Sequence, residues 1–362
     1  MAYIFVDGCD SGSGSTNTPM AQKWSWAVTN TSYLNWGGTG RFGGQAYYGG
    51  ATTLNIYGAG KAFPLTGTAV GTDEFFMGCS LYAAGTASGG YIMAFQNSTP
   101  VLDGSVTFST GSAPTQLSIR LTGSMTLAIY RGATLLATGT TVLTAGQWYR
   151  IEARIVISNT GVFDIRLNGN PEITFSGDTY DTGDLGVRQF CIVPTANTSA
   201  SLRFDDIVLY NSAAVEGEPT TWLGDLRIDT LRPTANGDVV NSTPLSGAAY
   251  AAVDEVAIDG DTTYTESTNI GDKDLYQLGD LTETPQTIHA VVVTAVAKST
   301  GTTNRAIKLK VKSSVEGDSA AKTVPLSAYG GLQASFSRDP ATTAAWTATA
   351  VNGMQAGWQV DT

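Results

Sequence analysis

Residues 146–174 constrain the fold of this chain more than any other part of its sequence. Apolar and polar side chains alternate over residues 148–157, and the alternation resumes over residues 163–167 after the turn-forming sequence Ser-Asn-Thr-Gly. A period of two is that of a strand with one buried and one solvated face. Asn168-Gly169 then favours a tight hairpin turn, because both residues tolerate positive φ. Three consecutive antiparallel strands are therefore expected here.

Length and composition extend this expectation to the whole chain. The 362 residues suffice for two domains, and the hydrophobic fraction of 42% indicates a globular protein. Charged residues make up only 14%, against about a quarter in an average soluble domain. Gly, Thr, Ser and Ala replace them, which favours short strands joined by tight turns and leaves few helix formers. The composition therefore predicts an all-β protein.

Strand patterns recur through the first 210 residues at the spacing of a two-sheet sandwich. Outside the hairpin, the predicted strands lie near residues 3–6, 75–82, 91–95, 106–108, 117–121, 125–130, 134–137, 187–193 and 201–210. A small, acidic stretch that contains Pro219 then interrupts the pattern and suits an exposed linker. The sequence therefore predicts a jelly-roll domain over 1–212, a linker over 213–221, and a second domain over 222–362.

The second domain is expected to be a smaller β-sandwich with one short helix. Residues 288–296 are apolar on both faces, so they are predicted to form a central strand. Residues 306–312 are its expected partner, and their three alternating lysines are interpreted as one solvated strand face that discourages edge pairing. Residues 344–354 give the clearest helical pattern.

Several of these segments resemble known protein families. WYRIEARI, a turn, RLNGN and finally FDDIVLYN resemble the concanavalin A-like, laminin-G-like jelly roll, in the version found in tailed-bacteriophage structural proteins. WLGDLRIDTLRPTANGD, DEVAIDGDTTY and DPATTAAWTATAVNGMQAGWQV are together similar to a module common at the C-termini of phage virion and tail proteins. The patterns mark the fold well and the activity poorly, because one fold hosts many functions.

This resemblance implies a non-enzymatic bacteriophage virion structural protein. It would be a capsid decoration protein or a tail or collar appendage, which docks on the particle and associates with copies of itself. A homotrimer is expected because the resembling appendages are commonly trimeric. The implied partners are other virion proteins, and the implied location is the virion, after synthesis in the host cytoplasm.

Charge and hydropathy exclude other classes of partner. The net charge is −11, with a sequence pI near 4.5, and Lys and Arg are not clustered. A broad nucleic-acid surface needs such clusters to neutralise phosphates, so no nucleic-acid partner is expected. The opening MAYIFVDGCD does not have the pattern of a signal peptide. No apolar run approaches the roughly eighteen residues of a membrane span, so no membrane insertion is expected.

No catalytic, cofactor-binding or metal-binding residues are predicted. Glycosidases of the jelly-roll fold carry a Glu-x-Asp-x-x-Glu strand, which this chain lacks. Glu152 stands between Arg150 and Arg154 on one strand face, where an ion pair explains it. His289 is the single histidine and falls in the predicted apolar strand, so a structural role is favoured over that of a general base.

Two groups of acidic residues leave calcium binding open. Asp254, Glu255, Asp259 and Asp261 form the densest group, and carboxylate oxygens suit calcium. Their spacing does not match an EF-hand loop, so a solvated acidic loop is favoured and no cofactor is assigned. Asp205-Asp206 carries the same ambiguity.

The three cysteines do not form a disulfide framework. Cys79 follows apolar residues on one face of a predicted strand, so a buried thiol is expected there. Cys9 and Cys191 could pair if their strands are neighbours, although sequence cannot establish the geometry that a disulfide needs.

One glycine- and aromatic-rich stretch supports an alternative function. Its rings could stack on sugars as an exposed platform, or they could fill one end of the sandwich core, and the core role is favoured. The candidate rings are Trp24, Trp26, Trp36, Tyr47 and Tyr48. The alternative function is therefore a carbohydrate-binding adsorption module that recognises host surface glycans, and it predicts an exposed line of these rings beside polar groups.

Overall fold

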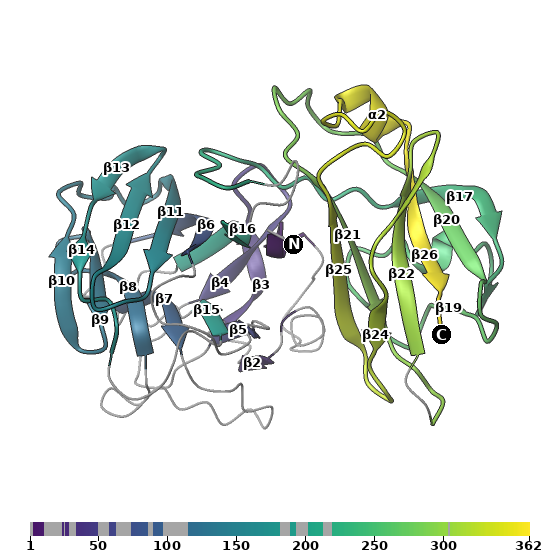
Figure 1. Cartoon of the computed structure of the whole chain (residues 1–362), viewed down its shortest axis with the longest axis horizontal. Coiled ribbons are helices and arrows are strands. Elements are labelled where there is room, and N and C mark those ends of the chain that lie inside the picture. The colour runs from purple at the N-terminus through teal and green to yellow at the C-terminus, as the bar shows by residue number, and fades with distance from the viewer. Residues whose placement is uncertain are drawn as a thin grey trace. The chain divides into compact units, whose positions relative to one another are not determined.

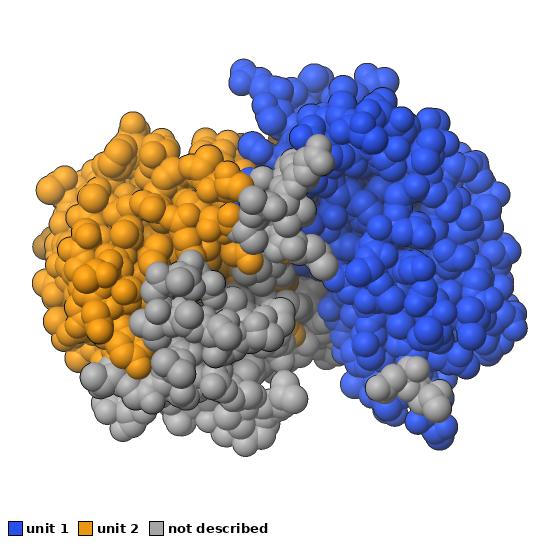
Figure 2. Space-filling model, in the orientation of Figure 1, with its two compact units in different colours: residues 1, 214–219, 229–362 blue, residues 2–213, 220–228 orange. Residues whose placement is uncertain are grey.

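The chain divides into two compact units, which Figure 2 colours separately. The computed structural model describes residues 3–10, 24, 26–28, 34–49, 58–62, 74–85, 90–96, 115–181, 189–192, 202–212, 219–302 and 305–362. The jelly-roll unit comprises residues 2–213 and 220–228, and the C-terminal unit comprises residues 1, 214–219 and 229–362. In the sequence, residues 222–228 open the predicted second domain, but in the structure they group with the first unit.

Two antiparallel sheets form the jelly-roll unit (Figure 1). Sheet A has the strand order β13-β12-β11-β6-β16-β4-β3, and sheet B has the order β10-β9-β8-β7-β15-β5-β2. Sheet A consists of β1 (Tyr3–Asp7), β3 (Leu34–Thr39), β4 (Gln45–Gly49), β6 (Glu74–Ala83), β11 (Trp148–Val156), β12 (Gly161–Leu167), β13 (Asn170–Ile173), β14 (Ser176–Gly177) and β16 (Leu202–Asn211). Sheet B consists of β2 (Trp26–Val28), β5 (Gly58–Ala62), β7 (Gly90–Gln96), β8 (Thr115–Leu121), β9 (Leu127–Arg131), β10 (Thr134–Thr138) and β15 (Gln189–Ile192).

This architecture confirms the prediction of an all-β chain that opens with a jelly-roll sandwich. The alternating hairpin is β11, β12 and β13, and its turn places Asn168 and Gly169 at φ 50° and 81°. Positive φ at both positions is what a tight two-residue hairpin turn requires. On its other side β11 pairs with β6 along its whole length. The predicted strand at residues 106–108 lies outside the described residues.

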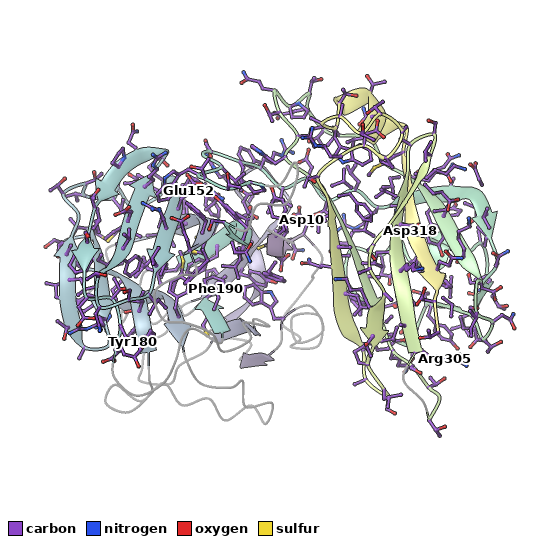
Figure 3. The ribbon with its side chains drawn as sticks, viewed as in Figure 1. Asp10, Glu152, Tyr180, Phe190, Arg305 and Asp318 are labelled. Atoms are coloured by element: carbon purple, nitrogen blue, oxygen red, sulfur yellow. The ribbon has the colours of Figure 1, made fainter. Side chains whose placement is uncertain are left out.

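The main core lies between the two sheets and is lined by the apolar positions of the alternating strands. Ile151 and Ile155 of β11 face it, together with Ile119 of β8, and all three are fully buried. Phe190 of β15 also lies in this core (Figure 3). Because side chains alternate between the faces of a strand, the polar residues of β8 and β11 that alternate with these positions point away from the core.

The 220–228 segment covers part of the outer face of sheet A. Its backbone N–H groups at Leu223 and Gly224 donate to Glu152 Oε1 over 3.1 and 3.0 Å. The Ile228 N–H donates to Asp206 Oδ1 over 2.9 Å. Buried carboxylates therefore bind this segment to the sheet, which explains why it belongs to the jelly-roll unit.

The C-terminal unit contains a sheet with the order β17-β20-β26-β22-β23, in which β24 also pairs with β22. Its strands are β17 (Pro233–Val240), β20 (Lys273–Leu278), β22 (Arg305–Lys312), β23 (Glu316–Asp318), β24 (Lys322–Val324) and β26 (Gln355–Val360). Two strand pairs accompany it, β18 (Thr243–Pro244) with β19 (Thr265–Glu266), and β21 (Val291–Ala297) with β25 (Gly330–Phe336). The helices are η1 (Tyr250–Ala252) and α2 (Ala348–Asn352). Among the described residues no helix has the length and apolarity that crossing a membrane would need.

The pairing of β21 corrects the strand partners predicted for this unit. The predicted central strand at 288–296 pairs with β25, not with residues 306–312, and the structure shows no second partner for it in the described residues. Packing explains one of its faces, because Val293 and Ala295 pack against the apolar cluster that contains Leu309 of the larger sheet. On the other face Thr294 is exposed, so β21 is not a central strand buried on both faces.

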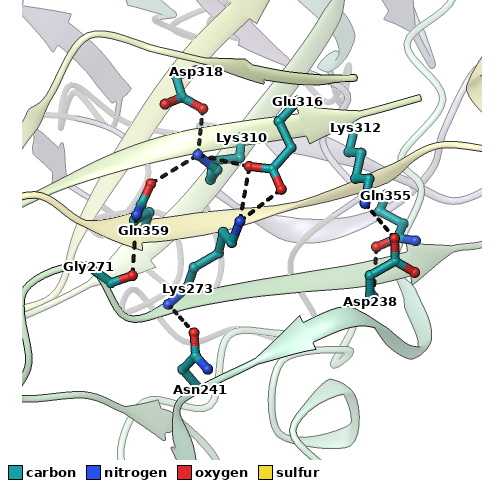
Figure 4. A network of polar contacts seen from close by, with 10 residues as sticks. All are labelled: Asp238, Asn241, Gly271, Lys273, Lys310, Lys312, Glu316, Asp318, Gln355 and Gln359. Carbon is teal, nitrogen blue, oxygen red and sulfur yellow. Dashed lines mark hydrogen bonds and ion pairs between the residues drawn. The ribbon is translucent and has the colours of Figure 1, made fainter. Parts of the chain in front are cut away.

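The lysines of β22 do not form a solvated edge. β22 lies inside its sheet, and Lys310 is 3% exposed. Its Nζ donates to Asp318 Oδ1 over 2.5 Å and to Gln359 Oε1 over 3.0 Å, while Lys312 Nζ bonds Asp238 over 2.5 Å (Figure 4). Neighbouring strands therefore supply carboxylates and amides that pair the alternating ammonium groups.

We expect Gly357→Ala to destabilise the C-terminal unit by roughly 1–3 kcal/mol, because it overpacks a strand pair. A Cβ at Gly357 would lie 1.9 Å from the carbonyl oxygen of Asp274 on the paired strand β20. Gly353→Ala is the matched control, since the nearest atom to its added Cβ lies at 3.4 Å. Calorimetric unfolding of both variants checks this, and equal transition temperatures would contradict the packing seen here.

Candidate functional site

The outer face of sheet B carries a row of polar side chains along β8. Leu117 and Ile119 point into the core, so Gln116, Ser118 and Arg120 point the other way. The backbone of this strand is tied to the following turn, where the Gly132 N–H donates to the Gln116 carbonyl over 3.2 Å. The row is buried at Gln116 and Ser118 and half-buried at Arg120.

Arg120 lies between two tyrosine rings from the neighbouring strands. Its Cζ is 4.2 Å from the ring centroid of Tyr91 on β7 and 3.8 Å from that of Tyr130 on β9. Nε donates to Ser118 Oγ over 3.2 Å, and Nη2 donates to the Gly132 carbonyl over 2.9 Å. Stacking and hydrogen bonds together fix the plane of the guanidinium.

The charge of Arg120 has no carboxylate partner among the described residues. Burial lowers the pKa of this guanidinium, and the two tyrosines oppose that change. By contrast, Arg131 pairs with Asp178, and Arg154 pairs with Glu74. A guanidinium is charged at all physiological pH values, and a desolvated charge is costly until it is paired. Arg120 is therefore ready to receive an anionic group.

Gln116 adds a second unsatisfied group to the same strand face. It is 1% exposed, and its Nε2 has no hydrogen-bond partner in the structure. Arg150 also has unpartnered nitrogens, but it is fully buried on sheet A, where its Nη1 donates to the Asp206 carbonyl over 2.7 Å. Buried amides in proteins are normally hydrogen-bonded. The unpartnered amide is therefore a cost to stability on this face of β8, and at 1% exposure it is out of direct reach of a ligand.

Together these side chains form an uncharged, hydrogen-bonding surface around one cation. The two half-buried phenols can exchange hydrogen bonds with hydroxyl groups, and the guanidinium can hold a carboxylate, while the amide and the hydroxyl are buried. Alternation at residues 117–121 predicted the strand and so implied that Arg120 lies on its polar face. The stack on Tyr91 and Tyr130 was missed, because it joins three strands whose register the sequence does not specify.

Two of the rings proposed as a sugar platform lie in the core. Trp24 and Tyr47 are buried in the core, with ring centroids 5.6 Å apart, and Trp24 Nε1 donates to Asp7 Oδ2 over 3.1 Å. Tyr48 is half-buried on the outer face of sheet A. The core role is therefore confirmed for Trp24 and Tyr47, while the side chains of Trp26 and Trp36 lie outside the described residues.

The acidic pair on β16 is a structural element of the buried face under the 220–228 segment. Asp205 accepts from the backbone N–H of Arg41 over 2.7 Å, and Asp206 accepts from Ser80 Oγ over 3.0 Å. Burial, together with the neighbouring Asp206, raises the pKa of Asp205 to about 8. Backbone and side-chain donors from four segments thus satisfy these carboxylates.

The acidic group of the C-terminal unit is spread over its surface. Asp259 accepts from Thr263, and Asp261 pairs with Lys298. Burial raises the pKa of Glu255, which is half-buried. Within the described part of the chain, no three His, Cys, Asp or Glu side chains are grouped so that they could hold a metal.

The remaining candidates have structural positions. Cys79 is buried as predicted, and Cys9 and Cys191 are also free, buried thiols, so the structure contains no bond between them in its described residues. Burial raises the pKa of the Cys191 thiol well above its usual range. His289 precedes β21 and is exposed, so the prediction that it lies inside that strand is wrong.

Comparisons with known proteins give structural matches only. No protein-family model matches the chain, and no curated protein does. An endo-β-1,4-glucuronan lyase from the fungus Trichoderma reesei matches 57% of this chain and 95% of its own, with 14% identity and a TM-score of 0.40. Alginate lyase Aly36B matches 57% and 96%, with 11% identity and the same TM-score. An alginate lyase from Aplysia kurodai matches 49% and 87%, with 9% identity and a TM-score of 0.36.

These matches correct the function predicted from the sequence. The matched structures are polysaccharide lyases, which overturns the prediction of a non-enzymatic virion structural protein, whether capsid decoration or appendage. The prediction that the chain is not an enzyme is contradicted by the same matches and is not carried further. The physical reason is that alternating strands such as WYRIEARI specify a sandwich, and a sandwich does not specify what its surface binds.

Proposed function

We propose that the jelly-roll unit binds glycan chains that carry carboxylate groups, on the outer face of sheet B. The observation that carries this proposal is Arg120, a half-buried cation held between Tyr91 and Tyr130 with no carboxylate partner in the described residues. The alternative interpretation of the sequence, glycan recognition, is thus retained, but with other residues than the five rings first considered.

A carboxylate fits the free side of the Arg120 guanidinium. Nε and Nη2 are engaged within the protein, whereas no hydrogen bond of Nη1 is seen in the described residues. A charge-assisted hydrogen bond to a carboxylate is shorter and stronger than a neutral one. Since the stack has already fixed the guanidinium, little side-chain entropy remains to be lost when a ligand binds.

The groups around Arg120 favour a sugar acid over a phosphate polymer. The accessible groups beside the guanidinium are the two half-buried tyrosines, whose neutral hydroxyls suit the hydroxyls of a sugar. A nucleic acid would need several cations in a row, and the chain has a net charge of −11. One cation among neutral polar groups matches a chain of hydroxyl-rich units with spaced carboxylates.

We expect Arg120→Gln to weaken binding of uronate oligosaccharides by between about tenfold and a hundredfold, the effect of one lost hydrogen bond to a charged group. Calorimetric titration with alginate and glucuronan oligosaccharides measures it. The matched control is Arg305→Gln, which removes the same charge from an exposed position on β22 (Figure 3). Equal affinities for both variants and the unaltered chain would overturn the proposal.

Gln116→Met should raise the free energy of unfolding by about 1–3 kcal/mol, because it removes a buried amide without a partner and keeps a similar volume. The same variant should bind uronate oligosaccharides as the unaltered chain does, because the amide is 1% exposed. Denaturant unfolding and the titration above measure the two effects. Ser118→Ala is the control: its hydroxyl accepts from Arg120, so no gain in stability is expected. If the Gln116→Met variant is less stable than the unaltered chain, the Gln116 amide has a hydrogen-bond partner and the prediction is wrong.

A second candidate function, β-elimination, is favoured by the two phenols beside the guanidinium. In this reaction Arg120 would neutralise the uronate carboxylate. A deprotonated tyrosine would take the proton from C5, the C4–O bond would break as the C4–C5 double bond forms, and the hydroxyl of the other tyrosine would protonate the leaving oxygen. Incubation with alginate and glucuronan should then generate the ultraviolet absorbance of the unsaturated product. Tyr91→Phe and Tyr130→Phe should show which phenol is needed, and binding without product would leave a binding module.

A further inference from the structure

The outer face of sheet A carries a row of three aromatic side chains and one arginine, which we call the aromatic row. It consists of Tyr48 on β4, Arg203 on β16, Tyr82 on β6 and Trp148 on β11. These residues are direct cross-strand partners, Tyr48 with Arg203, Arg203 with Tyr82, and Tyr82 with Trp148. Each is half-buried, while their chain neighbours Tyr47, Leu81 and Phe204 fill the core.

Three members of the row are in contact, Arg203 with Tyr82 and Tyr82 with Trp148. The ring centroids of Tyr82 and Trp148 are 5.4 Å apart, with an angle of 48° between the ring planes. The Arg203 Cζ lies 4.8 Å from the centroid of the Tyr82 ring, and its Nη1 donates to the Thr39 carbonyl over 3.4 Å. The Arg203 Nε is buried and has no partner. The row is thus a fixed set of rings with one unsatisfied donor.

The 220–228 segment covers a different part of the same face. Its Trp222 packs on the Phe76 ring, with centroids 5.4 Å apart, together with Leu223 and Leu226. Phe76 precedes Tyr82 by six residues on β6, which corresponds to about 20 Å along a strand. The described part of the segment therefore covers one end of β6, and the aromatic row lies at the other.

We propose that the aromatic row is a second binding surface, for unbranched chains of neutral sugars. Rings on adjacent strands recur at about 4.8 Å, so the row extends roughly 14 Å over four strands and suits a chain of several sugar units. Tyr and Trp rings have apolar faces and carry a polar group at the ring edge. A sugar ring likewise has an apolar face and polar hydroxyl groups at its edge. The row contains no carboxylate, and its single cation is stacked on a ring. It therefore has no group in common with the uronate site around Arg120 on the opposite sheet.

The composition of the row argues for a sugar over a protein partner. Protein interfaces have an apolar core, and the large hydrophobic side chains most exposed among the described residues of this unit are Phe42, Leu135 and Val142. None of them belongs to the aromatic row. The half-buried tyrosine and tryptophan rings of the row offer faces for stacking and polar groups for hydrogen bonds, which suits a sugar. They do not form the apolar core that a protein interface has.

Calorimetric titration of the full chain with cellohexaose and mannohexaose tests this proposal. We expect binding of at least one hexasaccharide, weaker binding of the corresponding disaccharide, and a loss of about tenfold or more in Trp148→Ala. Trp148→Phe keeps a ring and should retain most of the affinity. Phe42→Ala is the matched control, because it removes an exposed ring of the same unit from outside the row.

Two further measurements separate this proposal from its rivals and from the uronate site. Thermal unfolding of Trp148→Ala verifies the fold. This variant and the unaltered chain should have the same affinity for uronate oligosaccharides, whether the unaltered chain binds them tightly or not. Equal hexasaccharide binding by Trp148→Ala, or none by the unaltered chain, would overturn the proposal. Loss of self-association in Trp148→Ala, seen by sedimentation with sugar binding intact, would assign the row to contacts between copies.

Discussion

The jelly-roll unit depends on strands that are buried on both faces. β6, β11 and β16 contribute one face to the core between the sheets, and the 220–228 segment covers much of the other. A polar group under such a cover needs a partner, because an unpaired buried donor or acceptor costs about 1–3 kcal/mol. Glu152 therefore accepts two backbone N–H groups, and Asp206 accepts the Ile228 N–H and the Ser80 hydroxyl. Gly78 leaves the space that the Arg150 guanidinium occupies, since a Cβ there would lie 2.2 Å from its Nη2.

This double burial also decides where a ligand could bind. The middle of sheet A is closed by the protein itself, with its carboxylates directed at backbone donors of the 220–228 segment. What remains available is the outer face of sheet B and the end of sheet A beyond that segment. On these two surfaces Arg120 has no carboxylate partner in the described residues, and Gln116 Nε2 and Arg203 Nε have no acceptor. Under the 220–228 segment, Arg150 Nε and Nη2 and Glu152 Oε2 also lack partners, but there the protein itself covers them.

The sequence predicted well whatever follows from alternation along a single strand. β11 to β13, the turn at Asn168-Gly169 and the buried position of Cys79 all depend on which face a residue occupies. It predicted poorly what depends on the neighbour across the sheet. The lysines of β22 alternate as a solvated face would, yet Asp318, Glu316 and Gln359 from adjacent strands pair Lys310 in the interior (Figure 4). Arg120 and Trp148 were likewise visible as polar-face residues, but their ring partners come from other strands, and pairing order is not encoded in a local pattern.

The aromatic residues show the same limit, although the core role favoured from the sequence is confirmed for Trp24 and Tyr47. These two residues are 23 positions apart, and neither local pattern shows that they meet. In the structure they cluster around Asp7, whose carboxylate takes the Trp24 N–H and the Tyr47 hydroxyl, so polar atoms that would have favoured exposure are satisfied inside. Tyr82 and Trp148 are 66 residues apart in sequence numbering, yet the β6–β11 register makes them neighbours. A stacking surface on a sheet is made of side chains that lie side by side on neighbouring strands. Strand register decides which rings become neighbours, and the number of rings in one stretch of sequence does not.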